Sequence, residues 1–271
     1  MHISDPHFHR LPGDPRLFAS KRLFGALNLV LRRRFAHPPA RARRLVERLR
    51  ALDWSHLLIT GDLTQLGTAG EFVLAREVLA PLLQRSPGTV TVIPGNHDRY
   101  TPDALQRRDF ERHFGEFAGA GELCTRRLTG RWWMVAWDSA APAGLFSAAG
   151  RVRPETLRAT EAWLAGLPAG ARVIVANHYP LFYPPPHRYQ AHHDLANQEE
   201  VAAWLLRQPV QLYLHGHVHH NWLLTVQGER GPIAVVNSAS STRVPRYPGE
   251  SAFHRIVLEG DAFRVEPQSL D

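Results

Sequence analysis

Residues 90–98 of the chain read Val90-Thr91-Val92-Ile93-Pro94-Gly95-Asn96-His97-Asp98. Its first half is short, apolar and rich in β-branched residues, which is typical of a buried strand. Its second half changes abruptly to glycine and polar side chains. Four other apolar runs end in the same way: residues 57–60 before Gly61-Asp62, 132–137 before Asp138, 173–176 before Asn177-His178, and 212–214 before His215-Gly216-His217. We therefore predict buried strands whose carboxyl ends carry polar groups.

Helical patterns separate these strands. Helices are predicted over residues 39–52, 70–84 and 197–207, and Pro81 is expected to end or kink the second of them. Pro102 and Pro154 suit the first turns of two further helices. The last third is β-rich, with strands predicted at 221–227, 232–237, 253–258 and 262–266. This order indicates one α/β domain over residues 1–271 with a mixed sheet system.

Five polar clusters stand at or near the predicted strand ends, where ligands of α/β sheets collect. They are Asp5-Pro6-His7, Gly61-Asp62, Gly95-Asn96-His97-Asp98, Asn177-His178 and Gly216-His217-Val218-His219. Each alone has an ordinary explanation, such as a turn, but together they offer carboxylate, amide and imidazole ligands without thiolate. Such a set suits two ions of Mn, Fe or Zn. Asp62, in a tight glycine turn, is predicted to bridge both ions.

The spacing of two ligand pairs supports this prediction. In an extended segment, residues two apart point the same way. Asp5 and His7 are therefore expected to face one ion, and His217 and His219 to face a pair of ions.

In this order, the five clusters resemble the motifs of the calcineurin-like metallophosphoesterase superfamily: D-x-H, G-D, G-N-H-D/E, a single His and G-H-x-H. The resemblance covers nearly the whole chain. It implies a four-layer α/β/β/α sandwich, in which helices flank two mixed sheets. It also implies one ion held by Asp5, His7, Asp62 and His219, and a second held by Asp62, Asn96, His178 and His217.

The resemblance further implies a reaction. A metal-bridging hydroxide would attack a phosphodiester or pyrophosphate bond. Asp62 and His97 would be the catalytic residues, and His97 would face the scissile phosphate beside Asn96 without binding metal. Asp98 is expected to orient its loop.

Two departures from the family pattern narrow the prediction. The second motif, Gly61 to Gly67, lacks the second Asp and the Arg of the protein phosphatases' G-D-x-x-D-R-G. The chain is more similar to the bacterial group that contains cyclic-nucleotide phosphodiesterases and UDP-diacylglucosamine pyrophosphatases. Pro6 stands where the family has Leu, and only four residues precede Asp5. The ion shared by Asp5 and His7 is therefore predicted to bind less tightly.

Composition limits the partners and the compartment. A formal net charge of +7 and a pI near 10.3 favour anionic partners: phosphorylated substrates, nucleic acid or acidic lipids. No basic–aromatic recognition motif is present, which disfavours nucleic acid. A single cysteine, Cys124, excludes an intrachain disulfide and favours a reducing compartment. With no cleavable leader expected before Asp5, the sequence predicts a cytoplasmic protein.

Three segments bear on the substrate. Residues 17–34 form a basic amphipathic insertion, which suits peripheral contact with the inner membrane face, packing on the domain, or a homodimer interface. The loop 182–195, rich in Tyr, Pro and His, is expected to overhang the site and stack on a base or cover an acyl chain, or else to be an ordinary surface loop. Arg243 is expected either to meet a substrate phosphate or to serve a structural turn.

These features leave several functions open. The leading one is hydrolysis of a small nucleotide-type substrate. The alternatives are a membrane-surface UDP-2,3-diacylglucosamine-type pyrophosphatase, a nucleic-acid-processing phosphoesterase, and a metal-binding scaffold without turnover.

Overall fold

The computed structural model describes residues 1–10, 22–23, 34–85, 87–119, 123–142, 144, 147–245, 247, 250 and 252–270. The predicted insertion at 17–34 lies outside the described residues, apart from positions 22, 23 and 34.

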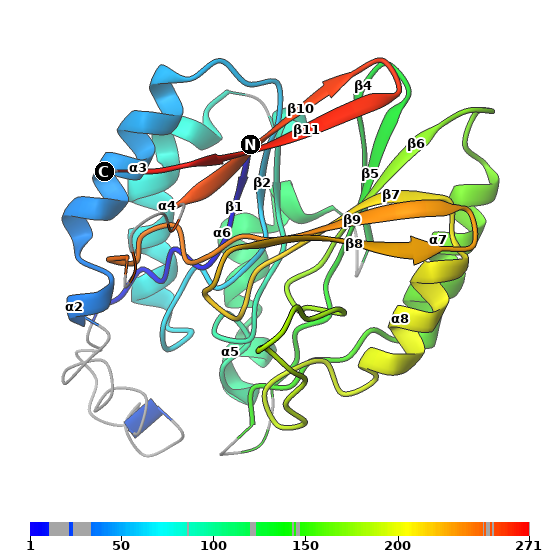
Figure 1. The fold of residues 1–271 in the computed structure, drawn as a ribbon. Coiled ribbons are helices and arrows are strands. Elements are labelled where there is room, and N and C mark those ends of the chain that lie inside the picture. Colours follow the sequence, from blue (N-terminus) through cyan, green and yellow to red (C-terminus); the bar gives the residue numbers. More distant parts are fainter. Residues whose placement is uncertain are drawn as a thin grey trace.

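Two mixed β-sheets occupy the centre of the described structure (Figure 1). The five-stranded sheet has the order β11 (Ala262–Gln268), β10 (Phe253–Glu259), β1 (His2–Ile3), β2 (Leu57–Ile59) and β3 (Val90–Val92). The six-stranded sheet has the order β4 (Leu123–Thr129), β5 (Trp132–Trp137), β6 (Arg172–Ala176), β7 (Val210–His215), β9 (Gly231–Asn237) and β8 (Trp222–Gly228). Strands β1, β2 and β3 run parallel, as do β5, β6, β7 and β9, so each parallel set aligns its carboxyl ends at one edge.

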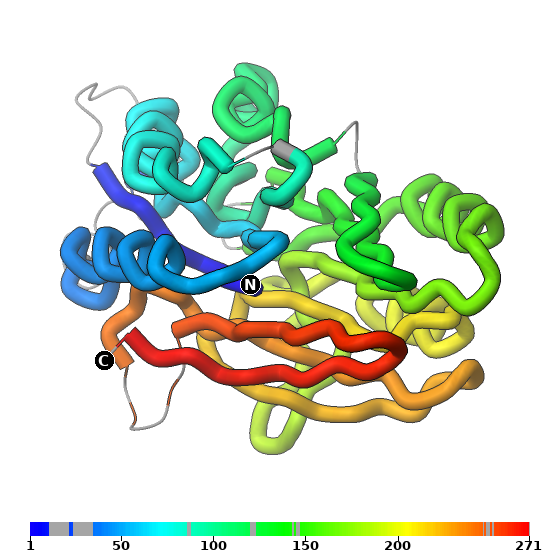
Figure 2. The backbone as a smooth tube through the Cα atoms, turned by 90° about the horizontal axis from the view of Figure 1, so that it is seen from above, coloured from blue at the N-terminus to red at the C-terminus, as the bar shows by residue number. Residues whose placement is uncertain are grey.

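Helices cover the outer face of each sheet, as Figure 2 shows from above. The five-stranded sheet carries α3 (Pro39–Ala51), α4 (Ala69–Leu83) and α6 (Asp109–Ala118), and the six-stranded sheet carries α7 (Pro154–Ala165) and α8 (Gln198–Arg207). The short helices are α2 (Arg34–Ala36), α5 (Pro102–Arg107) and the 3₁₀ turn η3 (Pro87–Thr89).

The buried apolar side chains fall into three clusters, one for each interface between layers. Strand β6 shows how one strand serves two of them. Val173 and Val175 pack outward with α7 and α8, whereas Ile174 and Ala176 point into the space between the sheets. This alternation follows from the two-residue period of a strand. The four-layer α/β/β/α sandwich is therefore confirmed.

The structure contains a strand and a helix of the two layers that the sequence did not predict. Strand β4 was not predicted, because its arginines and threonines hide the apolar pattern at a sheet edge. Helix α6 was not predicted either, although Phe110, Phe114 and Phe117 bury one face of it. Helix α4 includes Pro81 and ends two residues later, at Leu83, which agrees with the predicted end near this proline. Pro81 has no N–H to donate to the carbonyl of residue 77, so the last turn is one helical hydrogen bond poorer.

Glu71 gives the stability of the fold a pH dependence. Its Oε2 atom accepts hydrogen bonds from the backbone N–H groups of Leu66 (2.9 Å) and Thr68 (3.2 Å) in the capping box of α4. Burial raises the pKa of Glu71 from 4.5 to about 7, although these hydrogen bonds lower it in part. Between these values the folded protein retains a proton that the unfolded chain releases, so stability falls as pH rises through the window.

We therefore expect Glu71→Gln to flatten this dependence. Urea unfolding at about pH 5 and about pH 8 measures it, and wild type should lose up to about 3 kcal/mol more than the variant over that interval. Equal losses in the two proteins would contradict the prediction.

Candidate metal centre

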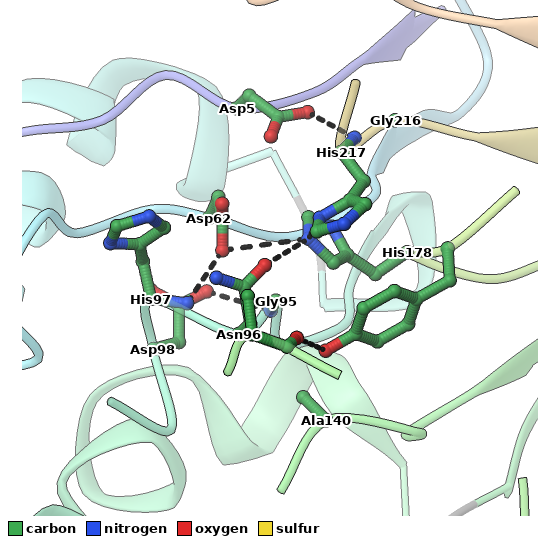
Figure 3. A network of polar contacts seen from close by, with 12 residues as sticks. Asp5, Asp62, Gly95, Asn96, His97, Asp98, Ala140, His178, Gly216 and His217 are labelled. Atoms are coloured by element: carbon green, nitrogen blue, oxygen red, sulfur yellow. Dashed lines mark hydrogen bonds and ion pairs between the residues drawn. The ribbon is translucent and has the colours of Figure 1, made fainter. Parts of the chain in front are cut away.

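The predicted ligands follow strand ends in both sheets. Asp5 and His7 follow β1, Asp62 follows β2, Asn96 follows β3, His178 follows β6, and His217 and His219 follow β7. Figure 3 shows Asp5, Asp62, Asn96, His178 and His217 converging on one region, with His97 to the side. The structure thus brings together residues from five separate segments.

The backbone at these positions is unusual. Asp5 (φ 51°), His7 (φ 48°), Asp62 (φ 52°), His217 (φ 78°) and His219 (φ 55°) all lie in the left-handed region. Among the described non-glycine residues, only Arg108 joins them. The extended backbone expected for the two ligand pairs is therefore wrong, although Asp5 and His7 still lie in one group of ligand atoms. Strained conformations of this kind concentrate at functional sites.

Backbone hydrogen bonds hold the first segment in place despite Pro6. The N–H groups of Asp5 and His7 donate to the carbonyls of Gly61 and Asp62, each at 3.0 Å. Only positions 5 and 7 donate an N–H to this pairing. Proline is tolerated at position 6 because no N–H is needed there. Gly95 is needed for a different reason, because a Cβ atom there would collide with the Asp62 carboxylate.

One group of ligand atoms comprises Asp5, His7, Asp62 and His219. Nε2 of His7 and Nε2 of His219 lie 2.9 Å apart. Oδ2 of Asp5 accepts a hydrogen bond from the N–H of His217, whereas Oδ1 accepts none from the described residues. That buried oxygen nevertheless lies 3.2 Å from Nε2 of His219 and 3.8 Å from Nε2 of His7. A carboxylate oxygen and two imidazole nitrogens converging in this way fit a cation.

A second group comprises Asp62, His178 and His217. Nε2 of His178 lies 3.1 Å from Nδ1 of His217 and 3.1 Å from Oδ1 of Asn96. Asn96 thus adds the amide oxygen that the sequence predicted for this ion.

Asp62 is common to both groups. Its Oδ2 lies 3.7 Å from Nε2 of His7, and its Oδ1 lies 3.6 Å from Nε2 of His178. Each oxygen therefore faces a different group, an arrangement that suits a carboxylate shared by two ions. The assignment of seven ligands to two ions agrees with this geometry and stays a prediction.

Hydrogen bonds to carbonyl oxygens fix which imidazole nitrogens carry protons. Nδ1 of His7 faces the carbonyl of Thr64 (3.1 Å), and Nδ1 of His178 faces that of Thr60 (2.7 Å). A carbonyl only accepts, so both Nδ1 atoms carry a proton and both Nε2 atoms present a lone pair to the site. His217 is reversed: Nε2 faces the carbonyl of His193 (2.9 Å), which leaves Nδ1 to bind an ion. Such outer contacts orient metal-binding histidines.

Burial keeps the inner histidines neutral. Desolvation lowers the pKa of His178 to about 3 and also lowers the pKa of His217. Burial alone would raise the pKa of Asp5, but the neighbouring imidazole of His219 holds it well below its usual value. Neutral imidazoles beside ionised carboxylates are the forms that bind metal.

His97 and Asp98 have different surroundings. Nδ1 of His97 lies 2.6 Å from the carbonyl of Gln65, and its ring stacks on Tyr100 outside both ligand groups. The Asp98 carboxylate accepts hydrogen bonds from the backbone N–H groups of Leu63, Thr64 and Gly95. Asp98 thereby joins the two turns that carry Asp62 and Asn96, which is what an orienting residue does.

A cavity of about 550 Å³ opens over the centre. Asp62, Asn96 and His97 line it, together with Arg243 and parts of the loop 182–195 such as Tyr183 and His193. The predicted position of this loop at the site is therefore confirmed. What Arg243 and the loop bind stays a prediction.

Sequence reasoning missed two residues next to the ligands. Asp194 is fully buried, and its Oδ1 lies 2.8 Å from Nδ1 of His193 and 3.5 Å from Nε2 of His217. It ties the loop to a predicted ligand, but no motif marks it in a stretch crowded with polar residues. His37, buried beside His7 and His219, lies far from any motif in the sequence.

Comparison with known proteins decides the family. The sequence model of the calcineurin-like phosphoesterases matches residues 1–221. The chain belongs to this family. The family is one of phosphoesterases, and the two ligand groups described above could each hold a metal ion. A comparison with curated protein sequences finds no significant match.

Solved structures share the fold. A dimetal phosphatase from Danio rerio matches with a TM-score of 0.65 at 16% identity, over 100% of this chain and 95% of that one. The purple acid phosphatase PPD1 from yellow lupin seeds matches with a TM-score of 0.60 at 12% identity, over 98% of this chain and 50% of that one. The sulfate thiohydrolase SoxB from Thermus thermophilus matches with a TM-score of 0.54 at 12% identity, over 99% and 56%. At these identities the likeness shows the fold alone.

Proposed function

We propose that the protein hydrolyses a phosphodiester or pyrophosphate bond in a small nucleotide-type substrate, with two ions of Mn, Fe or Zn. The observation that carries the proposal is the pair of ligand groups that share Asp62 at the floor of the cavity. When bound there, two ions polarise phosphoryl oxygens and lower the pKa of a water molecule that attacks phosphorus.

The shape and charge of the cavity support a substrate with groups on both sides of the scissile phosphorus. At about 550 Å³, the cavity extends well beyond the ligand groups to His187, Arg188 and His220. Among the described residues that line it, Asp62 is the one acidic side chain, whereas arginine and histidine side chains occur around the wall. Such a wall suits a second phosphate or another anionic group.

The chain's own residues divide the remaining tasks. Asn96 and His97 contact the scissile phosphate from one side of the cavity. His97 holds one proton on Nδ1 against the carbonyl of Gln65. It therefore acts as a general acid in its imidazolium form, whose second proton passes from Nε2 to the leaving oxygen. Arg243 and the rings of the loop 182–195 position the rest of the substrate.

A panel of four substrates tests the proposal. Mn-loaded protein is assayed with bis-p-nitrophenyl phosphate, p-nitrophenyl phosphate, cyclic AMP and a UDP-sugar pyrophosphate, and protein treated with a chelator is the control. We expect hydrolysis of the diester and of at least one nucleotide, each faster than hydrolysis of the monoester. Activity on the monoester alone would contradict the bond type, and activity on none would contradict the enzyme.

Location and assembly stay predictions. In the part of the chain that the structure describes, no helix has the length and hydropathy needed to cross a membrane. Peripheral contact with the inner membrane face, or a homodimer, would depend on residues 17–34. Liposome co-sedimentation of the full chain and of an 18–34 deletion tests the first, and equal binding by both forms would exclude it.

A further inference from the structure

A third imidazole lies beside the ligand group of Asp5. His37 stands between α2 and α3, and its side chain is buried. Its ring centroid lies 4.9 Å from that of His7 and 6.0 Å from that of His219. One ligand nitrogen from each of these three histidines lies within 4.8 Å of the others. His37 therefore has the position of a ligand beside His7 and His219, in a set separate from the one that includes Asp5 and Asp62, although it belongs to none of the five motifs.

Hydrogen bonds to two hydroxyl groups fix the tautomer of His37. Its Nδ1 lies 3.1 Å from Oγ1 of Thr242 and 3.3 Å from Oγ of Ser240. A hydroxyl has one proton to donate. Ser240 donates its proton to the carbonyl of Asp5 (2.5 Å), and Thr242 donates its proton to the carbonyl of Pro6 (2.6 Å). Both hydroxyls must therefore accept from His37, so Nδ1 carries the proton and Nε2 carries the lone pair.

The same contacts orient His37 toward the metal centre. Ser240 and Thr242 bind the backbone of Asp5 and Pro6, the segment that supplies two predicted ligands of the neighbouring ion. A histidine whose outer nitrogen is held by fixed acceptors is the usual arrangement of a metal ligand.

The position of His37 does not favour contact with substrate. The described residues that line the cavity include His219 but not His37. Only 5% of the surface of His37 is exposed.

We propose that Nε2 of His37 joins His7 and His219 as a further ligand of the ion that these two histidines hold. This proposal rests on the two-ion centre of the proposed function. The added imidazole makes this site richer in nitrogen than its neighbour, which favours Zn or Fe over Mn there. It would also offset the weaker binding that the short first strand predicts for this ion.

A His37→Asn variant separates the two nitrogens of His37. The asparagine amide nitrogen takes nearly the place of Nδ1, so it keeps a donor for Ser240 and Thr242 while Nε2 is removed. His254→Asn is the matched control, because His254 is another buried histidine and belongs to neither ligand group. Metal-free proteins are titrated with Co²⁺ against a chelating dye.

We expect wild type and His254→Asn to bind two ions. His37→Asn should bind one ion with unchanged affinity and the other about 10–100-fold more weakly. Two unchanged affinities in His37→Asn would overturn the proposal. Failure of wild type to bind any ion would instead overturn the proposed function.

A measurement on wild type alone keeps the test decisive if His37→Asn does not fold. In Co²⁺-loaded protein, each ligating histidine gives one solvent-exchangeable, paramagnetically shifted N–H signal in the proton NMR spectrum. The proposal predicts five such signals, from His7, His37, His178, His217 and His219. Four signals would overturn it.

Discussion

Replacing Asp62 with asparagine is expected to cost the protein both its second ion and nearly all of its turnover. The two oxygens of Asp62 face different ligand groups, at 3.7 Å from Nε2 of His7 and 3.6 Å from Nε2 of His178. An asparagine amide offers one oxygen and an NH₂ group that cannot bind a cation. We therefore expect at most one ion per chain. Turnover should fall about 10³-fold or more, since the ions supply several kcal/mol of transition-state stabilisation.

Elemental analysis and initial rates with bis-p-nitrophenyl phosphate measure these effects. Asp138→Asn is the matched control, because Asp138 also follows a strand but pairs with Arg99 at 2.7 Å and belongs to neither ligand group. The control should keep two ions. An Asp62→Asn protein with two tightly bound ions would show that Asp62 does not bridge.

Replacing His97 with alanine is expected to have the opposite pattern, with both ions kept and most turnover lost. The ring of His97 lines the cavity but belongs to neither ligand group. Loss of a general acid costs typically ~10²–10⁴-fold in rate. The loss should be largest for cyclic AMP, because its leaving sugar oxygen needs a proton. It should be smallest for bis-p-nitrophenyl phosphate, because p-nitrophenolate leaves without protonation.

Rates with both kinds of substrate, together with elemental analysis, test this pattern. His113→Ala serves as the control, since His113 lies on α6 and stacks against Phe72. Loss of an ion in His97→Ala would make His97 a ligand. An equal loss of rate for every substrate would argue that His97 stabilises charge on phosphorus and does not protonate the leaving oxygen.

Local patterns in the sequence were sufficient for the strand ends and the five motifs. A strand such as β6 is visible because Val173 to Ala176 form an unbroken apolar run that stops at a polar pair. Strand β4 and helix α6 were missed, since an edge strand and a short helix bury only part of their surface. The left-handed backbone at Asp5 and His7 was missed for a different reason: no short-range pattern predicts a conformation that tertiary contacts impose.

The residues around the ligands were also not predicted, because they are distant from the ligands in the sequence. His37 is held by Thr242, which is 205 positions away in the chain. Asp194 approaches His217 from a loop whose path the sequence does not specify. A motif identifies residues by their neighbours in the sequence. Residues that orient the ligands come close to them only in the folded protein, so the local sequence does not identify them.

The most direct test of the account is a metal titration of wild type during turnover. Metal-free protein is titrated with Mn²⁺ while hydrolysis of bis-p-nitrophenyl phosphate is followed. The account predicts little hydrolysis at one equivalent of Mn²⁺, a steep rise toward two, and no further increase beyond two ions per chain. Full activity at one equivalent would contradict the shared centre, and two bound ions without hydrolysis would contradict the enzyme.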